Sequence, residues 1–225
     1  MIHEFPQIMI VDRFNPKEII KKIELAGRTC YQSTDNTTDD PNKFIKSLVR
    51  RGHTSVLEHA SLSFRVKTDR GISHEWVRHR IASYSQESTR YCKYGDDVVF
   101  IRHLMPEVWD IQDKSDKQCE DEYKRLLAEN LKPEIARQAL NNNVKTEIYV
   151  TMNMRSLRNF FTLRADAHAH PYMKEIAIPF LLEMQDQLPA LFDDIMYDRE
   201  FYDKYLKNFL LDNSIVFYNN EYKCD

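Results

Sequence analysis

The sequence predicts an α+β fold, in which a small and mostly antiparallel sheet is flanked by helices within a single domain. Two segments, 61–68 and 146–152, alternate apolar and polar residues with the period expected of a half-buried strand. Helix start signals precede, separate and follow these segments, so helices and strands are interspersed along the chain. Because the sequence has no internal repeat, low-complexity stretch or linker, residues 1–225 are interpreted as one domain.

Two helices are expected before the first strand. Asn15 is a favourable cap, Pro16 suits the first helical turn, and apolar residues follow at helical spacing. Asp40 and Pro41 open a second helix in the same way, and Gly52 marks its end.

The first strand, 61–68, is expected to bury its even-numbered apolar residues on one face. Asp69 then caps a helix in which Ile72 and Trp76 face the core. The end of this helix delivers residues 78–80, where the chemistry of the chain is concentrated.

The second half of the chain continues the mixture of helices and strands. Helices are expected up to the C-terminus, although the stretch from residue 201 is rich in aromatic residues and has no clear period. The expected segments are a short strand at 98–101, helices at 117–130, 133–140, 155–164 and 171–188, and the second alternating strand at 146–152.

The composition limits the classes of function. The 32 Lys and Arg residues against 35 Asp and Glu residues give a net charge of −3, which argues against a general nucleic-acid binder. No apolar run reaches the roughly 18 residues needed to cross a bilayer, so no membrane role is expected. The four cysteines form no CxxC pair and residues 1–10 do not resemble a signal peptide, so a reducing, cytoplasmic location is expected.

One cluster of cationic and hydroxyl side chains stands out in the sequence. Arg78, His79 and Arg80 are followed after seven residues by Ser88 and then by Arg90, and all five can donate to anionic oxygen. With only four glycines, the chain contains neither a GxGxxG turn nor a GxxxxGK[ST] loop. Phosphate would therefore have to be bound by side chains, and the alternative for such a cluster is a solvated helix end.

This cluster resembles the Arg-His-Arg-(x7)-Ser signature of the flavin-dependent thymidylate synthases. Segments 28–33 and 52–59, Leu163-Arg164 and segment 169–171 resemble other segments of that family. The resemblance covers about residues 19–195, whereas residues 198–225 form a C-terminal extension without a counterpart.

The resemblance implies the fold of the thymidylate synthase-complementing proteins and their reaction. That reaction is the reductive methylation of dUMP to dTMP, with 5,10-methylenetetrahydrofolate as carbon donor. FAD reduced by NADPH carries the hydride, and no cysteine nucleophile takes part. The resemblance also implies a homotetramer with active sites shared between subunits.

The family's functional positions can be carried over to this sequence residue by residue. The positions implied for FAD are Ser55, Glu58, Arg78, His79, Arg80, Ile81, Arg164 and His168. Those implied for dUMP are Glu75, Arg78, Gln86, Glu87, Ser88, Thr89, Arg90 and Lys174. Those implied for catalysis are His53, Ser88 and Lys174.

Each of these positions also has a purely structural interpretation. His53 could be a histidine packed at a helix start, and Ser55 with Glu58 forms an S-x-x-E capping box. Arg164 could form an interhelical salt bridge. Ser88 is expected to bind phosphate rather than to act as a nucleophile, because no base is recognisable beside it.

Two positions depart from the family pattern. Its activating arginine, expected ten residues after Arg164, is replaced by Lys174, which keeps the charge but loses the planar donor pair. We therefore expect an active enzyme with altered dUMP affinity or turnover. Glu75 stands where glutamine is usual, and a carboxylate beside a nucleotide needs Arg78 or Arg90 as a partner, or a proton.

Two other classes of function remain open. One is an RNA- or nucleotide-binding module without chemistry, in which Tyr84 and Tyr91 stack on bases. The other is a metal-dependent hydrolase built on His168 and the histidine two residues later, although no third ligand is evident and no metal is expected. Cys92 is interpreted as a structural cysteine.

Overall fold

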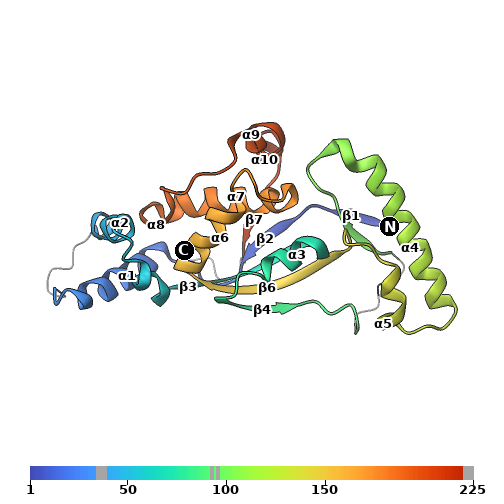
Figure 1. Cartoon of the computed structure of the whole chain (residues 1–225), viewed down its shortest axis with the longest axis horizontal. Helices are drawn as coiled ribbons and strands as arrows, with labels where there is room; N and C mark the ends of the chain where they lie inside the picture. The colour runs from blue at the N-terminus through green and yellow to red at the C-terminus, as the bar shows by residue number, and fades with distance from the viewer. Residues whose placement is uncertain (34–39, 92–93, 95–96, 220–225) are drawn as a thin grey trace.

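A five-stranded sheet forms the centre of the computed structural model, which describes residues 1–33, 40–91, 94 and 97–219. The strand order is β4-β6-β3-β2-β7, and every pair is antiparallel except β2 with β7. The strands are β2 (Gln7–Ile10), β3 (Ser61–Asp69), β4 (Ala82–Gln86), β6 (Lys145–Asn153) and β7 (Val216–Tyr218). The expected α+β fold with a mostly antiparallel sheet is confirmed (Figure 1).

The two strands predicted from alternation, β3 and β6, pair along their full length from Ser61 with Asn153 to Asp69 with Lys145. Their alternate residues are buried, as the period of two requires. Leu62, Phe64 and Val66 lie on the same buried face as Ile148, Val150 and Met152.

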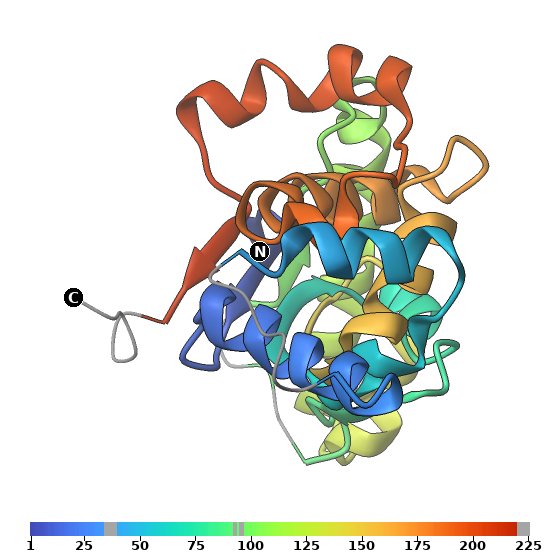
Figure 2. The same cartoon turned by 90° about the vertical axis from the view of Figure 1, so that its left-hand side faces the viewer.

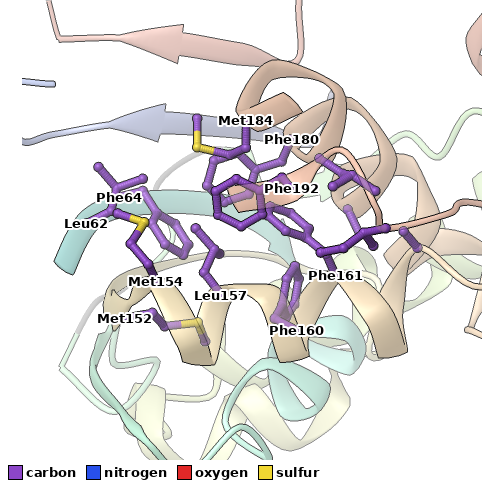
Figure 3. Packing of buried hydrophobic residues seen from close by; sticks show 14 of the residues in the cluster. Leu62, Phe64, Met152, Met154, Leu157, Phe160, Phe161, Phe180, Met184 and Phe192 are labelled. Atoms are coloured by element: carbon purple, nitrogen blue, oxygen red, sulfur yellow. The ribbon is translucent and has the colours of Figure 1, made fainter. Parts of the chain in front are cut away.

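Helices cover this face and enclose an aromatic core (Figure 3). Phe180 packs edge-on against Phe64 and Phe161, and Phe161 packs in the same way against Phe192. The helices of this layer and the N-terminal region are α1 (Pro16–Cys30), α2 (Asn42–Arg50), the 3₁₀ helix η2 (Thr54–His59), α6 (Met154–Arg164), α7 (Pro171–Gln187) and α8 (Pro189–Phe192).

A smaller second core lies at one end of the molecule (Figure 1). Here β1 (Ile2–Glu4) pairs in parallel with β5 (Val99–Ile101) beside α4 (Trp109–Ala128). The helix expected at 117–130 thus begins eight residues earlier. A 3₁₀ turn, η3 (Pro106–Val108), leads into α4. The helix expected at 133–140 is divided into α5 (Pro133–Ala136) and a second 3₁₀ turn, η4 (Arg137–Ala139).

The C-terminal extension corrects the expectation that helices continue to the end of the chain. After α9 (Arg199–Phe201), a π-helical turn η5 (Tyr202–Leu206) and α10 (Phe209–Asp212), the chain returns to the sheet as β7 (Figure 2). β7 pairs in parallel with β2 at the sheet edge. Within the described part of the chain, no helix is long and apolar enough to cross a membrane.

Candidate active site

The Arg-His-Arg cluster occupies the connection between a short helix and an edge strand of the sheet. This helix, α3 (Arg70–Trp76), begins at Asp69, whose Oδ1 accepts a hydrogen bond from the Ile72 amide at 2.9 Å. β4 follows and lies at the edge of the five-stranded sheet. Arg78 and Arg80 are exposed, and neither forms an ion pair with any described residue. Their charges are therefore available to an anionic ligand.

Tyr84 on β4 fixes the backbone of this connection. Its hydroxyl lies 2.8 Å from the carbonyl oxygen of Trp76 and 2.7 Å from that of His79, so its proton is shared between them. Burial raises the pKa of Tyr84 to about 12, which keeps the phenol protonated as a donor. Tyr84, which was expected to offer a stacking surface, is half-buried, and its hydroxyl is engaged with these two carbonyl groups.

Arg164, at the end of α6, is held by two residues of the α3 region. Its Nη1 lies 2.6 Å from Glu75 Oε2, and its Nε donates to His79 Nε2 at 3.0 Å. The structure thus contains the interhelical salt bridge that sequence analysis kept as an alternative. It also corrects the expected partner of Glu75, which is Arg164 rather than Arg78 or Arg90.

His79 is a buried neutral acceptor in this arrangement. Burial, reinforced by the positive charge of Arg164, lowers the pKa of His79 to about 4. Because Nε2 accepts from Arg164, the proton of the neutral ring lies on Nδ1. The imidazole packs edge-on against Phe160 and contributes no positive charge for an anion near neutral pH.

A cavity of about 620 Å³ opens beside this cluster. Leu163 and His168 contribute to its wall, and both are exposed. The expected FAD positions Arg164 and His168 are therefore brought together with the expected dUMP position Glu75. The lining residues are Glu75, Thr162, Leu163, Arg164, Asp166, His168, Ala169 and His170.

Lys174, which was expected to face the substrate ring, does not line this cavity. Its Nζ lies 2.7 Å from Asp198 Oδ2 and 3.2 Å from the carbonyl oxygen of Ala167, above the Phe201 ring. The side chain is 7% exposed. Burial alone would raise the pKa of Asp198, but the hydrogen bonds from Lys174 and from the Phe201 amide, together with the charge of Lys174, outweigh it and lower that pKa. Lys174 therefore joins α7 to the C-terminal extension.

The expected capping box of Ser55 and Glu58 is also wrong. The 3₁₀ helix begins at Thr54, so Ser55 lies inside it instead of at the extended cap position that the motif requires. Glu58 pairs with Arg155 at 2.5 Å. His53 precedes the helix with an exposed ring, and its Nδ1 lies 2.8 Å from the Tyr31 hydroxyl.

The segment from Gln86 to Arg90 is anchored mainly through side chains other than Ser88. Ser88 Oγ accepts a hydrogen bond from the Arg90 amide at 3.3 Å, and no base contacts this hydroxyl among the described residues. Gln86 Nε2 donates to Ser73 Oγ at 2.9 Å, and Glu87 Oε2 pairs with Lys145 at 3.2 Å. These contacts keep the Ser88 hydroxyl and the exposed Arg90 guanidinium at the surface.

Arg137 contacts the motif, which the sequence did not predict. Its Nη1 donates to Thr89 Oγ1 at 2.8 Å, which joins the turn after α5 to the motif. No local sequence pattern connects two residues 48 positions apart. The position of Arg137 just after a helix that begins at a proline does not identify its partner.

The histidines after α6 have separate roles. His168 is exposed and its Nδ1 lies 2.8 Å from Asp166 Oδ1, while His170 caps α7 through its Nδ1. Among the residues that the structure describes, no three His, Cys, Asp or Glu side chains form a metal-ligand group. Cys92 lies outside the described residues, and Cys30 and Cys119 are free thiols.

Comparisons with known proteins agree on one family. Residues 11–190 match the family model described as thymidylate synthase complementing protein. The chain is 35% identical over 186 residues to a flavin-dependent thymidylate synthase of Geobacter sulfurreducens, with 76% of this chain and 80% of that protein covered. It is 34% identical over 194 residues to the enzyme of the same name from Mycobacterium tuberculosis, with 76% and 78% covered.

A solved structure shows the same fold. The UMP/dUMP methylase PolB from Streptomyces cacaoi, bound with 5-Br dUMP, superimposes with a TM-score of 0.70 at 23% sequence identity. The superposition covers 91% of this chain and 98% of the other.

Proposed function

The chain belongs to the flavin-dependent thymidylate synthases, and we propose that it converts dUMP to dTMP with the 78–90 region as the centre of its active site. The proposed co-substrates are 5,10-methylenetetrahydrofolate and NADPH, and the proposed cofactor is FAD. The observation that carries the site assignment is the pair of exposed guanidinium groups of Arg78 and Arg80 just after α3, which form no ion pair within the described part of the chain.

The residues around the motif fit a flavin dinucleotide. Arg78 and Arg80 would hold the pyrophosphate, because a guanidinium binds phosphate oxygens with two donors at once. Ile81 and Leu163 are 74% and 54% exposed and would offer an apolar surface to a flat ring. When bound, the flavin supplies the hydride that the reductive methylation requires.

The proposed dUMP phosphate site is the segment from Glu87 to Arg90. The Ser88 hydroxyl, the Arg90 guanidinium and the main-chain amides of this segment are all donors to a phosphate. Arg137 fixes the segment through Thr89. Ser88 therefore binds phosphate in this proposal and does not act as a nucleophile.

Arg164, rather than Lys174, is proposed to face the uracil ring. Glu75 at 2.6 Å largely compensates the charge of Arg164, so this arginine is suited to a neutral carbonyl. Arg78 and Arg80 have no acidic partner among the described residues and are suited to phosphates. The neutral His79 fixes the Nε edge, so the guanidinium is already oriented when the substrate binds. A positioned donor stabilises the negative charge that develops on a ring oxygen.

A homotetramer in the cytoplasm is part of the proposal. The exposed apolar side chains Val77, Ile81 and Leu163 lie around the motif. A partner subunit or the cofactor would cover them, which fits an active site shared between subunits.

The test is an assay of dTMP formation from dUMP, methylenetetrahydrofolate and NADPH, with and without added FAD. We expect a yellow protein whose flavin absorbance is bleached by NADPH, and dTMP formation that depends on every component. A colourless protein that binds dUMP but never oxidises NADPH would support the nucleotide-binding module instead.

Replacing Tyr84 by phenylalanine is expected to weaken FAD binding several-fold. The substitution leaves the carbonyl oxygens of Trp76 and His79 without their donor and loosens the backbone that carries Arg78 and Arg80. The unfolding free energy should fall by about 1–2 kcal/mol. Flavin titration and urea unfolding measure the two effects.

Tyr149→Phe is the matched control for this substitution, because its hydroxyl has no partner among the described residues. Equal FAD affinity in the Tyr84 variant, the control and the unmodified protein would refute the positioning role of Tyr84.

A further inference from the structure

The loop between α6 and α7, residues 165–170, forms one wall of the cavity of about 620 Å³. Asp166, His168, Ala169 and His170 of this loop line the cavity. The His168 side chain is 96% exposed and contacts Asp166 of the same loop. The position of its ring therefore depends on how the loop backbone is held.

The C-terminal extension and α7 hold this backbone at the two carbonyl oxygens on either side of Asp166. The Asp198 amide donates to the carbonyl oxygen of Ala165 at 2.8 Å. The Lys174 ammonium group on α7 donates to the carbonyl oxygen of Ala167 at 3.2 Å. The first bond fixes the chain where it leaves α6, and the second fixes the next part of the loop.

Asp198 joins these two contacts into one unit, beside α7 at the start of α9 (Figure 1). Its Oδ2 accepts a hydrogen bond from Lys174 Nζ at 2.7 Å, and its Oδ1 accepts one from the Phe201 amide at 3.0 Å. The side chains of Asp198 and Lys174 are 12% and 7% exposed. A lysine as buried as this needs a carboxylate beside it, so Asp198 decides where the Lys174 ammonium group lies. Through that group it also fixes the carbonyl group of Ala167.

We propose that Asp198 is a positioning residue of the active site, which holds the 165–170 loop ready for the flavin through its own amide and through Lys174. The proposal rests on the proposed function, in which the flavin packs on Leu163, just before this loop. Asp198 lies outside residues 11–190, which the family model matches, so the anchor comes from the C-terminal extension. A loop that is fixed before the flavin binds need not be ordered on binding, which strengthens affinity.

This anchor should act on flavin affinity more than on turnover. Arg164, which is proposed to face the uracil ring, is oriented by Glu75 and His79 on the side of α3. Loosening the loop should therefore leave this donor in place once FAD is bound.

Asp198→Asn tests the proposal, because asparagine still caps α9 but no longer gives Lys174 a charged partner. FAD titration of the intact protein should show binding weakened by about three- to tenfold, the cost expected when a segment is ordered only on binding. The kcat at saturating FAD should change by less than about twofold, because the loss lies in binding. In the protein without ligand, hydrogen exchange of the peptide that contains residues 165–170 should become faster.

Two further variants show whether the effect runs through Lys174. Lys174→Met removes the ammonium group but keeps the length of the side chain, and the Lys174→Met/Asp198→Asn double variant should bind FAD no more weakly than Lys174→Met alone. Glu107→Gln is the matched control, because it breaks another contact of the C-terminal extension, with Lys204 and Tyr205. It should change neither the FAD affinity nor the exchange of the loop.

Faster exchange of the loop with unchanged FAD affinity in Asp198→Asn would overturn the proposal, because the contact would then be purely structural. Unchanged exchange would overturn it as well, and so would additive losses in the double variant or an equal FAD loss in Glu107→Gln. FAD binding by the unmodified protein is measured first. Its absence would refute the proposed function, whereas faster exchange confined to the 165–170 peptide would still show that Asp198 anchors the loop.

Discussion

Arg164→Ala is expected to lower the kcat of dTMP formation by about 100-fold or more, the loss typical of a positioned donor at a reacting oxygen. The guanidinium is oriented by Glu75 at 2.6 Å and by His79 at 3.0 Å, so its removal deletes a donor that is fixed before substrate binds. Steady-state kinetics with dUMP as the varied substrate measure kcat and KM.

The substitution also leaves Glu75 without its partner, and a control must separate this effect. Glu75→Gln alone keeps a side chain that can hydrogen-bond Arg164 but removes the negative charge. In the Arg164→Ala/Glu75→Gln double variant no unpaired carboxylate remains. If the double variant recovered full activity, the loss in Arg164→Ala would come from the exposed charge of Glu75 and not from a missing donor.

Lys174→Ala and Lys174→Arg test the residue that the sequence suggested as the partner of the uracil ring. Because Lys174 pairs with Asp198 away from the cavity, the alanine variant should lose stability more than it loses kcat. A kcat loss in folded Lys174→Ala as large as that of Arg164→Ala would place Lys174 in the active site after all.

His103→Leu is expected to lower the unfolding free energy by about 3–5 kcal/mol at pH 6.5, the cost typical of breaking a buried ion pair. His103 is 1% exposed and lies between two buried carboxylates, with Nδ1 3.0 Å from Glu175 and Nε2 3.3 Å from Asp69. Its ring stacks on Tyr172. Leucine would leave both carboxylates without a cation, one of them the cap of α3.

The stability difference should depend on pH. Burial alone would lower the pKa of His103, but the hydrogen bond to Glu175 and the negative charges of Glu175 and Asp69 together outweigh it and raise the pKa to about 9. Because the pKa of His103 is raised in the folded state, its protonation contributes stability that is fully present below the unfolded pKa of about 6.5. This contribution is lost as the pH rises through the folded pKa of about 9. The difference between His103→Leu and the unmodified protein should therefore narrow over that range.

Denaturant unfolding at pH 6.5 and pH 9 measures both predictions, with the exposed His59→Leu as control. A change below about 1 kcal/mol at pH 6.5, or a difference that is the same at both pH values, would show that His103 is not a buried cation.

Local patterns in the sequence predicted the parts of the fold that carry a strong period or cap. The alternation of 61–68 and 146–152 predicted β3 and β6, and Asn15 and Asp69 predicted the starts of α1 and α3. Strands of three to five residues, such as β4 and β7, are too short to show a period, and their pairing is decided by distant partners.

In the candidate site, too, local features were predictable and contacts between distant residues were not. The sequence predicted that a helix delivers Arg78 and Arg80 at its end, and both lie just after α3 as exposed cations. Side-chain partners were not predictable. Glu75 and Arg164 are 89 residues apart, and Arg137 reaches Thr89 across 48. Lys174 was assigned by spacing along the chain, whereas rotation about α7 and the position of Asp198 decide where its ammonium group lies.

The parallel pairing of β7 with β2 also has a consequence for biosynthesis. Ile8 pairs with Val216, so the two strands are separated by nearly the whole chain. On the ribosome, β2 therefore emerges first and keeps an open edge until residues 216–218 have been synthesised. Closing so long a loop is slow, and docking of the last strand is expected to be a late event in folding.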